Sequence, residues 1–147
     1  MEFGNEMQKN VYAMLLSWFG NDIRAGAIQQ IQDHPVFLLR QGSAIVQVTV
    51  SPVGESEAVI TVGARVVTGA QITPELMLFL LSQNGGTLFG AFGIDAKDNT
   101  ITFDHSIIGS TCDQKELVTS ISSVAETADK FDDPIIKILL LAAGVSF

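Results

Sequence analysis

The chain has 147 residues, which favours one domain over residues 1–147. Its formal net charge is −8 and its eight lysines and arginines are scattered, so we expect no nucleic acid or anionic membrane surface as a partner. Only 16% of the residues are charged and 47% are hydrophobic, which indicates either a dense core or an apolar surface covered by a partner.

No stretch has the pattern of a secretion signal or a membrane span. The N-terminal residues lack the basic segment of a signal peptide, and the apolar run at Ile135–Phe147 is shorter than the roughly 20 residues that a spanning helix needs. The single cysteine, Cys112, excludes an intrachain disulfide and suits a reducing compartment. We therefore expect a cytoplasmic protein.

The first element in chain order is a helix. Apolar residues recur there at spacings of three and four, and they are Met7, Val11, Met14, Leu15, Trp18 and Phe19. Gly20 and Asn21 are predicted to end this helix. The stretch from Asp22 to His34 fits a helix or a strand, and Pro35 ends it.

Three strand-like runs follow, at Val36–Arg40, Ser43–Ser51 and Ala58–Val66. The last two alternate and are joined by a short loop, so they predict an antiparallel hairpin. Even-numbered residues of the sheet are expected under the helices, and they include Val46, Val48, Ile60, Val62 and Phe92. The opposite face is expected to carry Ile45, Val59 and Phe89 among Gln47, Thr49 and Thr61.

A short helix is predicted next, capped by Thr73 with Pro74 at its first position. Its run Leu76–Leu81 is almost wholly apolar, so we expect it to be covered on more than one side. Two strands, Thr87–Asp95 and Thr100–Ile107, are expected after it.

The last helix is predicted to begin at Thr111, with Gln114 completing a capping box. Its apolar positions are Leu117, Ile121, Val124, Ala128 and Phe131. The sequence Asp132-Asp133-Pro134 is predicted to break or restart the helix before a final piece at Ile135–Leu141.

No motif indicates catalysis, a metal or a cofactor. His34 and His105 belong to no metal-spaced cluster, and the glycine-rich run Gly85–Gly93 leaves a helix for a strand, the reverse of a phosphate loop. Cys112 falls at a predicted helix N-terminus, where the dipole lowers a thiol pKa, but no base partner is recognisable. We expect a packed cysteine, no catalytic residue, no cofactor and no metal.

The element order and several motifs resemble those of a known bacterial family. The motifs are Ile72–Leu76, Leu80-Leu81, Asn84, Leu88–Asp95, Ile101–His105, Glu116-Leu117 and Ala128-Asp129. They resemble the YbjN-type proteins, described as putative sensory transduction regulators, within the type III secretion chaperone-like fold. The resemblance implies an α+β fold: helix–three strands–helix–two strands–helix, with an antiparallel sheet packed against long N- and C-terminal helices.

The resemblance also implies a function. Secretion chaperones of this fold are small acidic dimers that hold a partner segment on apolar patches and are not enzymes. We therefore expect a non-enzymatic homodimer that binds a protein or peptide. The alternative is a small-molecule-sensing or regulatory domain. The expected partner-binding or dimer surface comprises Ile45, Val59, Leu76, Phe79, Leu80 and Phe89.

Overall fold

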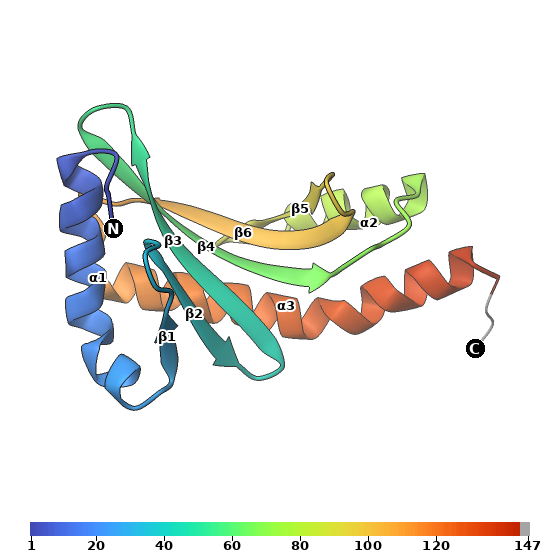
Figure 1. The fold of residues 1–147 in the computed structure, drawn as a ribbon. Coiled ribbons are helices and arrows are strands. Elements are labelled where there is room, and N and C mark those ends of the chain that lie inside the picture. Colours follow the sequence, from blue (N-terminus) through green and yellow to red (C-terminus); the bar gives the residue numbers. More distant parts are fainter. Residues whose placement is uncertain (145–147) are drawn as a thin grey trace.

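The computed structural model describes residues 1–144; the end of the apolar C-terminal run, residues 145–147, lies outside them. The described residues form three helices and six strands (Figure 1). The helices are α1 (Glu6–Arg24), α2 (Pro74–Asn84) and α3 (Gln114–Ala142). The strands are β1 (Ile28–Gln30), β2 (Val36–Gln41), β3 (Ala44–Val53), β4 (Glu57–Val67), β5 (Ala91–Asp95) and β6 (Thr100–Ile108).

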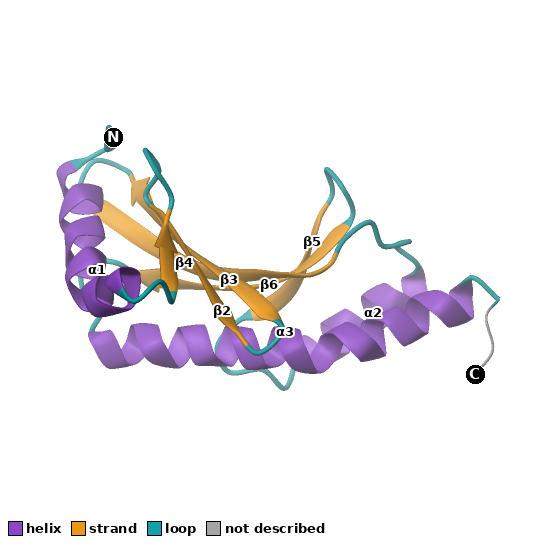
Figure 2. Cartoon of the chain, turned by 60° about the horizontal axis from the view of Figure 1, so that its bottom comes forward, coloured by secondary structure: helices purple, strands orange, loops and turns teal. Residues whose placement is uncertain are grey.

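The strands make one antiparallel sheet in the order β1-β2-β3-β4-β6-β5. The long helix α3 contacts β2, β3, β4 and β6, while α1 contacts β1, β3 and β4. Both pack on the same face of the curved sheet, and the opposite face has no helix over it (Figure 2). The expected α+β fold with long terminal helices is confirmed.

The core lies between the sheet and the two long helices. Alternate residues of the β3–β4 hairpin are wholly buried there, and they are Val46, Val48, Val50, Ala58, Ile60 and Val62. The even-numbered positions therefore face the helices, as the alternation predicts. The buried polar side chain of Gln8 joins α1 to the sheet, because its amide donates to the carbonyl of Val50 at 2.9 Å.

The N-terminal helix is longer than the sequence predicts. It continues through Gly20 and Asn21 to Arg24, whose guanidinium contacts the Asn21 side chain. One glycine costs a helix only about 1 kcal/mol, and the buried Phe19 and partly buried Ile23 hold the turn on each side of it against the core. The helix ends instead before Gly26, which has a φ of +79° that favours glycine.

The ambiguous stretch after α1 contains a sixth strand. β1 pairs with β2 through Ile28↔Leu39, Gln29↔Leu38 and Gln30↔Phe37. Three residues are too few to show a period in the sequence, so tertiary contacts decide the structure here. Ile28 is buried, and the Gln30 amide donates to the Tyr12 hydroxyl at 2.6 Å.

Two further predictions of element bounds are wrong. β5 begins at Ala91 rather than Thr87, because the segment before it is occupied by a loop whose Thr87 hydroxyl donates to the carbonyls of Asn84 and Gly90. α3 begins at Gln114 rather than Thr111, and its N-cap is Asp113, which accepts from the Glu116 N–H at 2.7 Å.

The C-terminal helix also runs through Pro134 without the predicted break. Proline in a helix interior removes one hydrogen bond and costs about 3 kcal/mol. Packing on both sides of it opposes that cost: the Phe131 ring lies 5.4 Å from the Phe92 ring and 6.3 Å from the Phe79 ring, and Ile135 is wholly buried.

Cys112 precedes this helix and is 7% exposed. Its thiol donates to the Asp113 carbonyl at 3.3 Å. Burial, followed by the negative charges of Glu116 and Asp113, raises the pKa of the Cys112 thiol to about 11. This direction is opposite to the one that a helix dipole alone would produce, so the thiol is a poor nucleophile at neutral pH.

We expect Ile60→Ala to lower the free energy of unfolding by about 2–5 kcal/mol, because Ile60 is wholly buried and truncation leaves a cavity. Thr61→Ala, one residue along on the half-buried opposite face, is the matched control and should cost far less. Urea unfolding followed by circular dichroism measures both. Equal losses would mean that the two faces of the sheet are wrongly assigned.

We expect the thiol of Cys112 to react slowly with a maleimide at pH 8 in the folded protein and rapidly after unfolding. Because its folded pKa of about 11 exceeds the unfolded value of roughly 8.5, the unfolded chain loses this proton first. The free energy of unfolding should therefore fall as the pH rises from about 9 to 11, and less so in Cys112→Ser. Rapid labelling of the folded protein at pH 8 would contradict the burial of the thiol.

Candidate functional site

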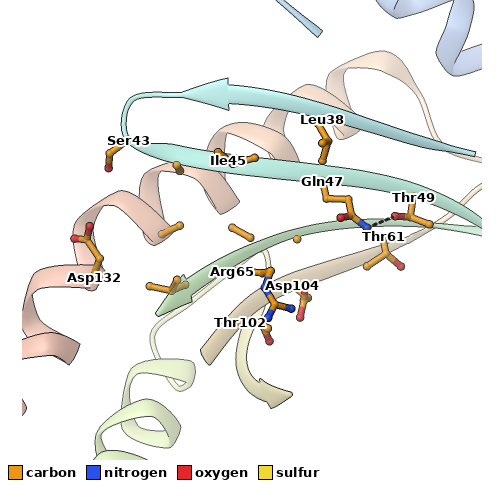
Figure 3. Close-up of a pocket in the computed structure, with 15 residues that line it drawn as sticks. Leu38, Ser43, Ile45, Gln47, Thr49, Thr61, Arg65, Thr102, Asp104 and Asp132 are labelled. Atoms are coloured by element: carbon orange, nitrogen blue, oxygen red, sulfur yellow. Dashed lines mark hydrogen bonds between the residues drawn. The ribbon is translucent and has the colours of Figure 1, made fainter. Parts of the chain in front are cut away.

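A cleft of about 430 Å³ opens on the helix-free face of the sheet (Figure 3). It lies where the start of β3 and the end of β4 separate, beyond their last pair Val46↔Ala64, and Ala128 and Asp132 of α3 line its far side. The pairing of β4 with β6 shifts register between Arg65 and Val67 at this place. Such an irregularity bends a strand and redirects its side chains, which is how a cleft forms within a paired sheet.

One row of residues crosses the sheet through this cleft. The strand registers place Leu38 opposite Gln47, Gln47 opposite Gly63, Gly63 opposite Asp104, and Asp104 opposite Ala91. Side chains opposite one another on antiparallel strands are near neighbours on one face. The small residues at two of these positions leave the Asp104 carboxylate room to lie over its neighbours.

Gly63 leaves room for the side chain of Asp104. A Cβ atom at residue 63 would stand 2.1 Å from Oδ1 of Asp104, so the carboxylate occupies the space that any side chain there would fill. Glycine inside a strand often marks such a close approach. Desolvation of this carboxyl raises the pKa of Asp104, and its hydrogen bond with the Thr102 side chain opposes the rise.

Arg65 is held by neighbours on the turn between β5 and β6. Its Nη2 contacts the Asp98 carboxylate and donates to the Thr100 hydroxyl at 2.7 Å, while Nη1 lies 3.7 Å from Asp95. The hydrogen bond with Thr100 and then Arg65 keep the pKa of Asp98 below its usual value. Asp95 and Asp98 near this turn thus form an ion-pair network with Arg65.

A second surface feature is apolar and lies on α2. Met77, Leu78 and Leu81 are 40%, 68% and 69% exposed, and Leu88 in the loop that follows is 87% exposed. A groove of about 210 Å³ runs between this helix and β5, bounded by Met77, Leu80, Leu81, Phe92 and Ile94. The helix is therefore covered on one side, whereas its composition predicted cover on more than one.

The neighbouring edge of the sheet is closed by a side chain. Asn84, the last residue of α2, accepts from the Phe92 N–H at 2.6 Å and donates to the Phe92 carbonyl at 3.2 Å. These are the groups of the edge strand β5 that a further strand would need. Asn84 thus makes addition of a strand at this edge unfavourable and leaves the side chains of α2 as the exposed feature.

The structure separates the six residues of the expected binding surface. Ile45, 51% exposed, lines the cleft. Val59 shares its face, but it pairs with Ser51 and so lies roughly 20 Å along the hairpin. Phe89 lies on the helix-bearing side, its ring 5.9 Å from that of His105, which contacts Ser120 of α3.

The remaining three expected residues face inward. Leu76 and Leu80 are buried, and Phe79 packs against Phe131. The exposed residues of α2 are their neighbours Met77, Leu78 and Leu81, which sequence reasoning missed. The helix phase contains the signal, because Leu76 and Leu80 are spaced by four. For Asp104, the alternation of β6 indicates its face, because it lies between the inward-facing Phe103 and His105, but its pairing with Gly63 has no local signal.

Other chemistry is not assembled in the part of the chain that the structure describes. Within residues 1–144 no three His, Cys, Asp or Glu side chains gather closely enough to hold a metal ion. Nδ1 of His105 lies 2.8 Å from Oγ of Ser120, and a phenylalanine ring covers the histidine, so this pair is packed between sheet and helix. None of the helices formed by these residues is both long and apolar enough to span a bilayer.

Known proteins provide an independent comparison. The chain is similar to the type III secretion chaperone SycH of Yersinia pestis, solved in complex with a stable fragment of YscM2. The match has 17% sequence identity and a TM-score of 0.50, and it covers 80% of this chain and 96% of that one, which shows a shared fold. No curated protein matches the sequence.

A family model supports the resemblance seen in the sequence. The family described as "T3SS (YopN, CesT) and YbjN peptide-binding chaperone 1" matches residues 6–139. The match includes all six strands and nearly all of the three helices. This chain therefore belongs to the family of type III secretion and YbjN peptide-binding chaperones.

Proposed function

We propose that this chain is a non-enzymatic chaperone that holds an extended segment of a partner protein across the open face of its sheet. The observation that carries the proposal is the helix-free sheet face with its cleft, in a member of a peptide-binding chaperone family. The buried thiol of Cys112, with its raised pKa, offers no cysteine nucleophile for an enzymatic role.

The open face suits an extended chain for a physical reason. Side chains of an extended segment alternate with a period of two, and the cleft offers two kinds of contact. Leu38, Ile45 and Val66 supply apolar surface, while Gln47, Thr49 and Thr61 supply hydrogen-bonding groups. Gln47, Thr49 and Thr61 have a paired strand on each side, so contacts with them use side chains rather than strand addition. The β3–β4 pairing ends at Val46↔Ala64, so Ile45 and Val66 lie beyond it.

We further propose that the protein is a homodimer joined through the exposed side of α2. A chain with a net charge of −8 repels its own copies, so association needs a surface nearly free of charge. Of the eleven residues of α2 only Glu75 is charged, and Met77, Leu78 and Leu81 lie exposed beside Leu88. A two-fold pair is the commonest way to cover such a patch.

A small-molecule sensor is the second candidate function. Arg65, Asp104 and the Gln47 amide all line the cleft, as they would in a site for a polar ligand. Ligand pockets, however, bury most of their ligand, and here Ile45, Gln47, Arg65 and Asp104 are all exposed. The open shape favours a chain that continues beyond the cleft on both sides.

The dimer is tested by Leu78→Glu combined with Leu81→Glu. We expect the wild type to have about twice the 15.7 kDa mass of the chain in light scattering after size exclusion, and the double variant to be a monomer. Val118→Glu, at a 51% exposed site on α3, is the matched control and should leave the dimer intact. A monomeric wild type at micromolar concentration would refute this interface.

The peptide-binding role is tested by selection from a random peptide library on the immobilised protein. We expect Ile45→Ser to weaken binding of the selected peptides at least tenfold in fluorescence anisotropy, because it removes an apolar contact from the cleft without adding charge. Val53→Ser is the control, since Val53 lies on the same strand and face with 49% exposure, about 26 Å away. Selection of no peptide, or equal affinity in the two variants, would argue against the proposed site.

A further inference from the structure

The cleft has an excess of negative charge. Among the described residues that line it, Asp104 and Asp132 are acidic and Arg65 is the one cation. The guanidinium of Arg65 is already engaged by Asp95 and Asp98, which lie just outside the cleft. Arg40 shares the open face, opposite Ile45, but does not line the cleft. A bound group that adds positive charge is therefore favoured over an anion.

Asp104 is a cleft carboxylate without a counter-ion among the described residues, as is Asp132, and Asp104 lies in the sheet itself. No ion pair joins it to a lysine or arginine in the described part of the chain. Two neighbours nevertheless define the position of this carboxyl. Gly63 leaves space for Oδ1, and the Thr102 side chain hydrogen-bonds to the carboxyl. A carboxylate that is partly desolvated, fixed in place and unpaired gains more from an added cation than a fully hydrated one does.

We propose that Asp104 is the counter-ion for a lysine or arginine side chain of the bound partner segment, which enters the cleft beside Gly63. This inference rests on the proposed binding of an extended segment. Ile45 and Val66 line the same cleft and supply apolar surface for neighbouring residues of the segment. Gln47 donates its amide N–H to Thr49 at 3.1 Å, which leaves its amide oxygen as an acceptor.

The proposal is tested on the whole chain without knowledge of the natural partner. Nα-acetyl-lysine N-methylamide is titrated into ¹⁵N-labelled protein, with Nα-acetyl-norleucine N-methylamide as the uncharged probe. We expect the lysine probe to shift the amide signals of Gly63, Thr102 and Asp104 with a dissociation constant in about the millimolar range. The norleucine probe should shift them at least fivefold less, and added salt should weaken the lysine response.

Two variants separate the charge of Asp104 from its position. Asp104→Asn should lower the affinity for the lysine probe at least fivefold, because it removes the negative charge. Gly63→Ala keeps the charge but should lower the affinity for the lysine probe by a similar factor, since its Cβ would displace Oδ1 of Asp104. Glu55→Gln, on the exposed β3–β4 loop, changes net charge by the same amount and should have no effect. Equal responses to both probes, or equal affinities in Asp104→Asn and Glu55→Gln, would overturn the inference.

Peptide selection then distinguishes failure of this inference from failure of the proposed function. We expect the selected peptides to share a lysine or arginine at one position, and to lose that preference when the selection is repeated on Asp104→Asn. Peptides that bind without any basic residue would overturn the inference and leave the chaperone role standing. If the protein responds to the lysine probe but selects no peptide, the ligand would be a small amine. That outcome would overturn the proposal that Asp104 contacts a side chain of a partner segment.

Discussion

The one-sided burial of the β3–β4 hairpin is the constraint on which the rest of this structure depends. Val48 and Ile60 are wholly buried, while Gln47 and Thr61, one residue away, face the other side. A slip of one residue in the pairing would exchange the two faces. Both long helices must therefore pack on the same side, and the opposite face has no helix over it (Figure 2).

The sequence predicted those elements whose pattern repeats over several residues. Both strands of the hairpin and the apolar positions of α3 carry enough repeats to identify their period. The errors arise where one residue was given too much weight. Gly20 costs a helix about 1 kcal/mol and Pro134 about 3 kcal/mol, and the packing of Phe19 and Phe131 beside them opposes those costs.

The surface was harder to predict than the core, because it depends on how distant segments meet. Ile45 and Val59 do share a face, as their odd numbers indicate, yet the register places them at opposite ends of the hairpin. Phe89 was assigned to that face on the assumption of a regular strand, and a loop carries it to the other side. Gly63 and Asp104 are neighbours on paired strands but lie 41 positions apart in the sequence, so no local pattern indicates their contact.

The low charge content of the chain acquires a physical meaning once its charges are located. Asp95 and Asp98 hold Arg65, so a cation beside the cleft does not neutralise Asp104. The exposed side of α2, by contrast, has almost no charge, and Asn84 closes the sheet edge beside it. Copies of this acidic chain repel one another over most of their surface. The same negative charge would attract a basic partner. The proposed self-association through the exposed side of α2 and the proposed partner contact at Asp104 are compatible on one acidic chain, because the two surfaces would be stabilised by different interactions.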